Sequence, residues 1–203
     1  MALTNAYATL AEVRDHLKDD GAKLTPAVLE RAINAASRAV DRHCGRQFWR
    51  DASVTTRTYV PTHPTLLLVD DISTRTGLVV SVGSDGTTFP TVLTSTSYLL
   101  EPRNADVVAG GDTADAHAFW EIRRLGGQWS TGRGLPTVQV VARFGWSTIP
   151  DEVKQATIIK AAALFKRKDA PFGVAGFSEF GAVRVTRADA DVMDLLAPFE
   201  LAP

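Results

Sequence analysis

The side chains that could do chemistry are few, and their spacing does not bring them together. The four histidines are His16, His43, His63 and His117, and none has a second metal-ligating residue three or four positions away on a shared helix face. Cys44 directly follows His43, but adjacent helical residues point apart and do not form a nucleophile–base pair. We therefore expect Cys44 to be a small core or interface residue, and we expect no catalytic residue.

The acidic residues do not form a convincing site either. Asp70 and Asp71 lie at the predicted end of a strand, where consecutive side chains face opposite ways, so a solvated turn is favoured over a carboxylate metal pair. Asp189, Asp191 and Asp194 lack the glycine and the terminal glutamate of a calcium loop and are expected to cap and solvate the last helix. No phosphate-binding glycine loop is present. We predict no metal, no cofactor and no enzyme; a hydrolase that uses Asp70 or Asp71 is the remote alternative.

The composition excludes several classes of protein. The chain has 203 residues, 45% of them apolar, with a single cysteine and a net charge of −1. This length can bury a core without disulfides, and one cysteine cannot form an internal disulfide, which favours a reducing compartment. The longest apolar runs are far shorter than the roughly 18 residues of a membrane helix, and no secretory signal is expected. Charges are balanced in each third of the chain, which disfavours a protein that mainly neutralises nucleic-acid phosphates.

Helical patterns occupy both ends of the chain. Residues 9–12 (Thr-Leu-Ala-Glu) have the spacing of a capping box and precede apolar residues at helical spacing. A second helix is predicted to begin with a cap residue and a proline at 25–26 and to end at Gly45. A third begins at Pro150 and is apolar on most sides, so we expect it to be buried on more than one face. A short last helix is expected over 189–196.

The middle of the chain has the alternation and the turn signals of strands. The strand candidates are residues 54–60, 66–69, 77–82, 91–100, 119–125 and 137–144. A hairpin turn is predicted at Ser84–Gly86. Residues 103–118 have no periodicity and are expected to form a mobile loop.

These patterns predict an α+β fold in which a helical unit is interrupted by a β-rich insertion. The helical part, residues 1–53 and 148–203, is expected to be a discontinuous bundle of three to four helices. The insertion, residues 54–147, is expected to be an antiparallel β-rich domain. The segment 172–181 contains three phenylalanines and three glycines, and two interpretations stay open. It is either a loop folded over its own core or a segment that orders against another subunit.

In the order of its features the chain resembles the head-to-tail connector (adaptor, or head-completion) proteins of long-tailed bacteriophages. The resemblance covers both helical flanks well and the insertion weakly, and its motifs are structural rather than catalytic. The residues that carry it are Tyr7–Leu10, Leu29–Phe48, Val141–Trp146, Ile149–Ala156, Lys166–Gly173 and Val192–Phe199. The abundance of Arg and Ala suits a phage of a GC-rich actinobacterial host.

The resemblance implies a non-enzymatic virion protein of the neck, at the head–tail interface, assembled from chains made in the host cytoplasm. Its copies would form a ring, commonly of twelve, beneath the portal protein. The ring would extend the DNA channel and offer a docking surface to a tail-side stopper or tail-terminator protein. DNA would pass through without sequence-specific binding, and no membrane is implied. Minimal members of the family have a smaller β element, so the insertion is expected to widen the ring or form its tail-side face.

Two sets of residues are candidates for these contacts. Arg31, Arg38 and Arg42 are expected on an exposed helix face, where they would pair with acidic groups of a neighbouring copy. The C-terminal part is expected to dock the portal and to rearrange as it does so. The residues assigned to this docking segment are Phe172, Phe177, Phe180, Arg184, Arg187, Leu195, Leu196 and Phe199.

A second function class fits the same patterns. In it the insertion is a β-sandwich binding or decoration module of a virion, the helices are appendages, and neither a ring nor a portal contact is needed. The two classes differ in whether the chain forms a ring when mixed with portal protein.

Overall fold

The computed structural model describes two compact units. It describes residues 2–18, 25–103, 117–131, 134–167 and 189–201, and the backbone alone of 174–178 and 181–184. The helical unit consists of Met1–Arg46 and Ile149–Pro203, and the β unit is Gln47–Thr148. Residues 47–53, which the sequence pattern leaves with the helical flank, belong to the β unit. The expected loop over 103–118 lies almost wholly outside the described residues.

The described part of the helical unit contains four α-helices and a short hairpin. Its elements are α1 (Leu10–Leu17), α2 (Pro26–Cys44), α4 (Asp151–Lys166), β8 (Val174–Ser178), β9 (Gly181–Arg184), α5 (Ala190–Leu196) and the 3-10 turn η3 (Ala197–Phe199). All four predicted helix starts agree with the structure to within one residue. They include the capping box, in which Thr9 Oγ1 accepts from the Glu12 N–H and the Glu12 carboxylate accepts from the Thr9 N–H. Gly45 ends α2 in the left-handed conformation at φ 66°.

The segment around 174–184 differs from the interpretation as a loop, and its ordering against another subunit stays a prediction. The backbones of β8 and β9 pair as an antiparallel hairpin rather than forming an irregular loop. The pattern hid this because phenylalanine and glycine occur there without a strand alternation.

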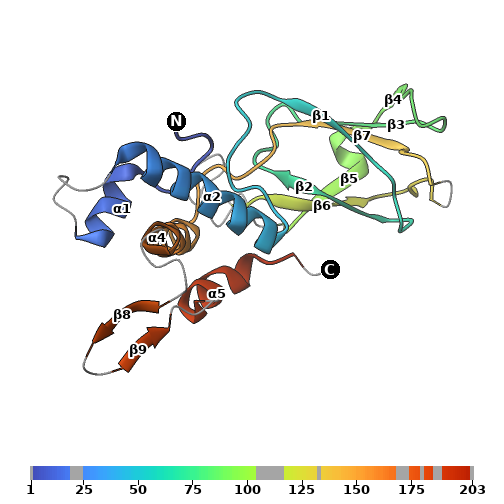
Figure 1. Cartoon of the computed structure of the whole chain (residues 1–203). Coiled ribbons are helices and arrows are strands. Elements are labelled where there is room, and N and C mark those ends of the chain that lie inside the picture. Colours follow the sequence, from blue (N-terminus) through green and yellow to red (C-terminus); the bar gives the residue numbers. More distant parts are fainter. Residues whose placement is uncertain are drawn as a thin grey trace. The chain divides into compact units, whose positions relative to one another are not determined.

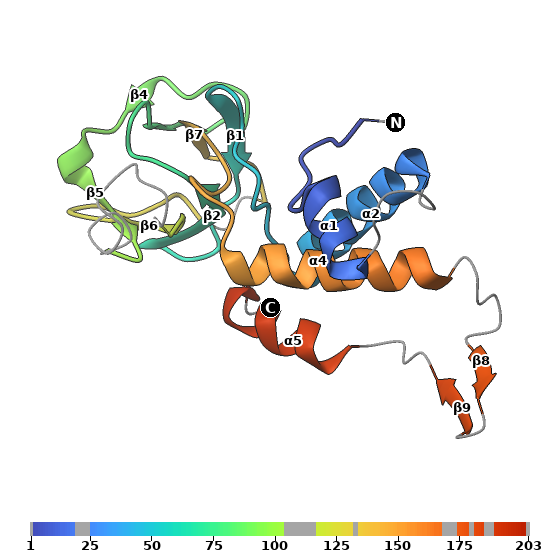
Figure 2. The ribbon, with the colours of Figure 1, turned by 90° about the vertical axis from the view of Figure 1, so that its left-hand side faces the viewer.

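Helix α4 is the centre of the helical unit. It contacts α1, α2 and α5, and Figure 2 shows it between the first two helices and α5. As the sequence predicts, it is buried on more than one side, because small and branched residues cover most of its surface. The buried core that it shares with α1 and α2 contains Ala8, Val13, Leu29, Ile33, Ala36, Ile158, Ala161 and Phe165. Helix α5 adds the buried side chains of Val192 and Leu196.

The β unit consists of two antiparallel sheets that face each other (Figure 1). One sheet has the order β1 (Thr55–Tyr59), β7 (Val138–Ala142), β3 (Val79–Val82), β4 (Thr91–Val92). The other has the order β2 (Leu66–Ile72), β6 (Phe119–Arg124), β5 (Tyr98–Glu101). Alternate residues of both sheets point inward and form one core, with Ile72, Val80, Phe119, Ile122, Val138, Val140 and Phe144 among its members.

The predicted strands are largely confirmed, with one interruption. Residues 91–100 do not form a single strand, because the 3-10 turn η1 (Ser95–Ser97) separates β4 from β5. The hydroxyls of Thr96 and Ser97 in this turn each bond to the Thr94 hydroxyl. The turn predicted at Ser84–Gly86 is present, and Asp85 Oδ1 accepts hydrogen bonds from the backbone N–H groups of Thr87 and Thr88.

Gly145 occupies a position that other residues cannot fill. Its φ is +101°, and a Cβ atom there would lie 2.0 Å from the backbone oxygen of Trp49. Its N–H donates to the Asp71 carbonyl at 2.7 Å. The segment that enters the β unit and the segment that leaves it therefore pass each other here in backbone contact.

We predict that Gly145→Ala lowers the free energy of unfolding more than Gly126→Ala does. Gly126 also has a positive φ, +64°, but an added Cβ there meets no atom within 4 Å. Backbone strain alone accounts for a loss of about 1 kcal/mol at Gly126, and the clash with Trp49 raises the loss at Gly145 to more than about 2 kcal/mol. Urea denaturation of both variants measures the difference. Equal losses would contradict the close approach.

Candidate functional site

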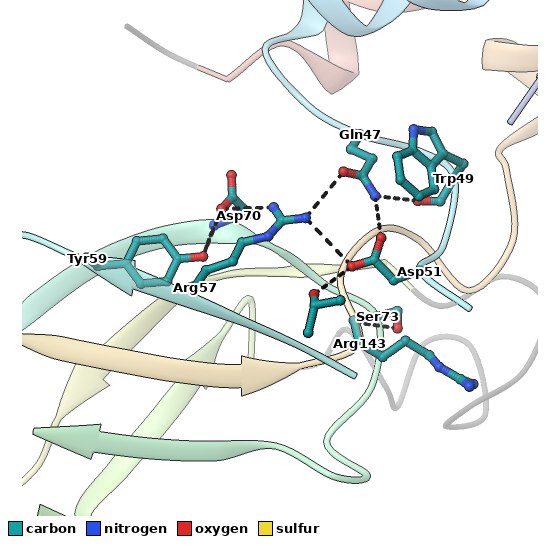
Figure 3. Close-up of polar contacts among 9 residues, drawn as sticks. Gln47, Trp49, Asp51, Arg57, Tyr59, Asp70, Ser73 and Arg143 are labelled. Carbon is teal, nitrogen blue, oxygen red and sulfur yellow. Dashed lines mark hydrogen bonds and ion pairs between the residues drawn. The ribbon is translucent and has the colours of Figure 1, made fainter. Parts of the chain in front are cut away.

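A polar network lies in the β unit at the point where the chain enters and leaves it (Figure 3). We call it the crossing network, and its members are Gln47, Asp51, Thr55, Arg57, Tyr59, Asp70 and Phe144. The geometry of the network shows whether these side chains are arranged for catalysis or for stabilising the structure.

Arg57 is at the centre of the crossing network. Its Nη1 lies 2.9 Å from Asp70 Oδ2, and its Nη2 donates to Gln47 Oε1 at 3.4 Å. Asp51 Oδ2 lies 3.7 Å from the same Nη2. The guanidinium also lies over the Phe144 ring, 4.0 Å from its centroid. One planar cation thus joins the entering segment, β2 and Phe144 in the leaving segment after β7.

Asp51 is buried and its carboxylate is well satisfied. Oδ1 accepts from Gln47 Nε2 at 3.1 Å, and Oδ2 accepts from Thr55 Oγ1 at 2.8 Å. Its backbone N–H donates to the Phe144 carbonyl at 2.8 Å. Each of these contacts ties Asp51 to another part of the crossing network, which suits a structural role.

Tyr59 connects the edge strand β1 to β2 through its side chain. Its hydroxyl donates to Asp70 Oδ2 at 2.8 Å. Burial, and then the charge of the neighbouring Asp70, raise the pKa of Tyr59, so the phenol stays protonated and keeps donating. The network therefore contains carboxylates, an arginine and a neutral phenol, with no activated nucleophile.

The structure separates Asp70 from Asp71 as the alternation predicts, but the predicted solvated turn is wrong. Both residues lie inside β2. The Asp70 side chain is half-exposed, whereas Asp71 is buried and its Oδ2 accepts from Trp146 Nε1 at 2.8 Å. The pattern missed this because the partner indole lies about seventy residues away. The two carboxylates therefore have separate partners and do not converge as a paired metal site would require.

The face of α2 predicted to meet a neighbour carries a second polar cluster. Arg38 Nε lies 2.8 Å from Asp41 Oδ2, and Arg38 Nη2 donates to the Asn5 carbonyl at 2.9 Å. The Tyr7 hydroxyl donates to Asp41, and the Arg38 guanidinium lies 5.5 Å from the Tyr7 ring centroid. Burial raises the pKa of Asp41, against the lowering effect of the Tyr7 and Arg38 hydrogen bonds. Arg38 therefore holds the N-terminal segment against α2.

Arg31 and Arg42 are placed differently from Arg38. Both are exposed on α2, as the sequence predicts. Of the three arginines, these two keep the accessibility that a contact with a neighbouring copy needs.

A pocket of about 340 Å³ lies within the helical unit between α2, α4 and α5. Its apolar lining comes from Ala39, Val40, Val192, Met193 and Leu196. Its polar lining is basic and consists of Arg42, His43 and Lys160. Sequence reasoning missed this pocket, because its residues come from three helices that are far apart in the chain.

The C-terminal segment is tied to the end of α2. The Leu201 N–H donates to the Cys44 carbonyl at 3.0 Å, and Glu200 lies 2.8 Å from His43 Nε2. Cys44 is buried, as predicted, and burial raises the pKa of its thiol to about 12. The segment therefore closes the helical unit beside the pocket.

The predicted docking residues are distributed unevenly. Leu196 and Phe199 are buried in the helical unit, and Leu195 is half-buried. Phe177 and Arg184 lie in β8 and β9, where only the backbone is described. Phe172, Phe180 and Arg187 lie outside the described residues.

Among the described residues, no three His, Cys, Asp or Glu side chains gather as a metal site would require. Of the helices described, none combines the length and the apolar character needed to cross a bilayer. Asp189 caps α5 by accepting from the Asp191 N–H, as predicted.

The chain matches known proteins only at the level of solved structures. No protein-family model matches the chain, and no curated protein matches it. A chain from a structure of the neck of an empty gene transfer agent (GTA) particle, computed with C6 symmetry, matches with a TM-score of 0.57 at 17% identity. A chain from the neck of the native particle, computed with C12 symmetry, matches at 0.55 and 19%, and one from the virion of the native particle at 0.53 and 19%.

The matches extend over the whole of this chain and most of the other. Each covers 100% of this chain and 93–94% of the other. At these identities the likeness concerns the fold, and the fold it concerns includes the β unit as well as the helices.

We predict that Arg57→Lys destabilises the β unit by about 1–2 kcal/mol. Lysine keeps the charge but cannot contact Asp70 and Gln47 together while lying flat on Phe144. Arg123→Lys is the matched control, because Arg123 is half-exposed and pairs with Glu121 alone among the described residues. Thermal unfolding compares the two variants. A control that loses as much as Arg57→Lys would refute a central role for Arg57.

A second prediction separates Arg38 from Arg31. Arg38→Ala removes the contacts to Asn5, Tyr7 and Asp41, so hydrogen exchange of the amides in residues 2–9 should become faster by about tenfold or more. Arg31→Ala, at an exposed position of the same helix, should leave those amides unchanged. Unchanged exchange in the Arg38 variant would show that the N-terminal segment is held by its other bonds.

Proposed function

We propose that the chain is a non-enzymatic structural protein of the neck of a phage-like particle, where its copies form a ring between portal and tail. The observation that carries the proposal is the full-length match to chains from gene transfer agent neck structures. The fold match supports the neck assignment. The C6 and C12 symmetries of those structures support a ring. In this role the portal protein is the partner on one side and a tail-side stopper or terminator on the other.

The charges of the chain suit a ring through which DNA passes. A net charge of −1 spread over 203 residues gives little counterion release, so a channel lined by this protein would not hold the duplex strongly. Balanced charges also suit a cyclic ring, in which one patch of each copy meets a different patch of the next.

The match also bears on the alternative of a decoration module. In that alternative the β unit is the binding part and the helices are appendages. The relatives in neck structures match across the helical unit and the β unit together, which favours a role that uses both. In the proposed ring the β unit would then either widen the ring or form its tail-side face.

The buried C-terminal residues change how the docking hypothesis must be tested. Val192, Leu196 and Phe199 belong to the core of the helical unit, so deletion of residues 184–203 would remove core side chains as well as a docking segment. Leu195→Asp is the sharper variant, because its side chain is only half-buried. If α5 docks the portal, this variant should lose portal binding and keep its fold; normal binding would count against the segment.

The experiment that tests the function mixes the purified chain with the portal of its own particle and measures the mass of the complex. We expect a closed ring, commonly of twelve copies, on each portal. Arg31→Glu should reduce the copies bound because it reverses an exposed charge on α2, whereas Lys166→Glu, an equal charge change at another exposed site, should not. A monomer that never joins the portal would contradict the proposal and favour the decoration module.

A further inference from the structure

In the described part of the β unit, three of the strands at the sheet edges carry features that hinder pairing with a further strand. The edge strand β2 is irregular, because its register shifts between Leu68 and Ile72. The edge strand β4 is only two residues long, and β5 ends at Glu101, directly before Pro102. Bulges, short strands, charges and prolines are the usual means by which proteins prevent strand addition at a sheet edge.

The edge strand β1 carries none of these features. It pairs with β7 over five consecutive residues without a register shift, and its other side pairs with no described strand. Its sequence, Thr-Thr-Arg-Thr-Tyr, consists mostly of residues that favour strands and contains neither Lys nor Pro. Its one charged side chain, Arg57, already contacts Asp70 and Gln47. The strand therefore presents a regular row of backbone N–H and C=O groups to an incoming strand.

The hairpin of the helical unit lacks a third strand. Strands β8 and β9 pair with each other alone among the described strands, and no described helix packs extensively on them. A two-stranded hairpin is marginally stable in water unless a further strand or a helix packs on it. Between the pairs Val174–Arg184 and Phe177–Ala182, β8 has one residue more than β9, so β8 is the bulged strand. The regular edge of the hairpin is therefore that of β9.

We propose that β9 of one copy adds to the edge of β1 of a neighbouring copy and extends its four-stranded sheet. The inference rests on the proposed ring and names a contact that builds it. The two strands agree in length, because β9 has four residues and β1 has five. Main-chain hydrogen bonds supply the affinity in strand addition, and the hairpin gains the third strand that it lacks.

The occupant of the β1 edge is a second copy, because each of the two edges offers the backbone groups that the other lacks. Within the described chain the two edges are not brought together: β1 pairs with β7, and β9 pairs with β8. The hairpin belongs to the helical unit and β1 to the β unit, so the contact joins two different patches. Such a contact leaves one open edge at each end of a row of copies, and a closed ring pairs every edge.

The test is crosslinking between copies that each carry one added cysteine. One variant is Thr58→Cys in β1 and the other is Ala182→Cys in β9. Cys44 is buried and the pKa of its thiol is raised to about 12, so it stays unreactive towards a maleimide. The two variants, of different mass through an affinity tag, are mixed and treated with a short bismaleimide. The reaction is run on the chain alone at high concentration and on the chain bound to the portal, and intact mass measures the mixed dimer.

The matched control is Thr91→Cys mixed with Ala182→Cys. Thr91 is likewise an exposed threonine on an edge strand of the same sheet, but it lies in β4 at the opposite edge. We expect the Thr58 pair to give about tenfold more mixed dimer than the Thr91 pair in at least one of the two preparations. Equal yields from the two pairs in both preparations would overturn the proposal. Thermal unfolding of each variant checks that it folds.

Two further results would assign the β9 edge to another occupant. Crosslinking within a single chain that carries both Thr58→Cys and Ala182→Cys, at a concentration too low for association, would place β9 on the β1 edge of its own copy. Crosslinking of the Ala182→Cys variant to the portal, without a product to position 58, would make the portal the partner. Either result would overturn the contact between copies.

Hydrogen exchange tests the strand pairing itself without an added cysteine. Strand addition should slow the exchange of alternate amides in residues 55–59 by about tenfold or more when the copies assemble. Replacing residues 174–184 by a Gly–Ser linker of the same length should abolish this slowing, and none of the described core residues of the helical unit lies in that segment. Amides of β1 that exchange equally fast in the assembly and in the single chain would contradict the proposal.

The same variants distinguish this contact from the proposed function. A ring on the portal together with equal crosslinking of the Thr58 and Thr91 pairs would retain the function and reject the contact. Strong crosslinking of the Thr58 pair at high concentration, without any ring on the portal, would retain the contact between copies and reject the neck assignment.

Discussion

The helical unit depends on the burial of α4, a helix that arrives about a hundred residues after α2 in the sequence. Helices α1 and α2 offer one apolar face between them, and α4 supplies the side chains that cover it, among them Ile158, Ala161 and Phe165. Helix α5 then packs on α4 from another side. The core therefore closes only when the chain has completed the β unit, which makes the bundle a structure of long-range contacts.

This constraint explains where the polar contacts of the β unit are concentrated. The chain must leave after α2 and return before α4, so the entering and leaving segments have to lie together. Backbone contact at Gly145, the hydrogen bond from Asp51 to the Phe144 carbonyl, and Arg57 stacked on Phe144 hold them so. The crossing network is thus explained by the architecture of the β unit.

Local patterns in the sequence predict most helices and strands. The features that they do not predict depend on contacts between residues far apart in the chain. The capping box at Thr9, the glycine end of α2 and the alternation of the strands each depend on neighbours within a few residues, so they could be read directly. Burial of Asp71 and the pocket beside Met193 depend on residues that only the fold brings together. Arg38 shows the same limit: its helix position was predicted, but its contacts with Asn5 and Tyr7 were not. Candidate surfaces on one helix can therefore be predicted, whereas partners across the fold cannot.

The helical unit and the β unit are each compact by themselves. In the proposed ring, contacts with neighbouring copies must therefore position both units of every copy. The match to neck chains over the full length, at TM-scores of 0.53–0.57, makes the neck the place to look for that assembly. The most direct measurement is a cryo-EM reconstruction of the neck of the particle that contains this chain. We expect a closed ring between portal and tail, in which the helical unit and the β unit of each copy both account for density. A neck without this chain, or the chain found on the outer surface of the capsid, would contradict it.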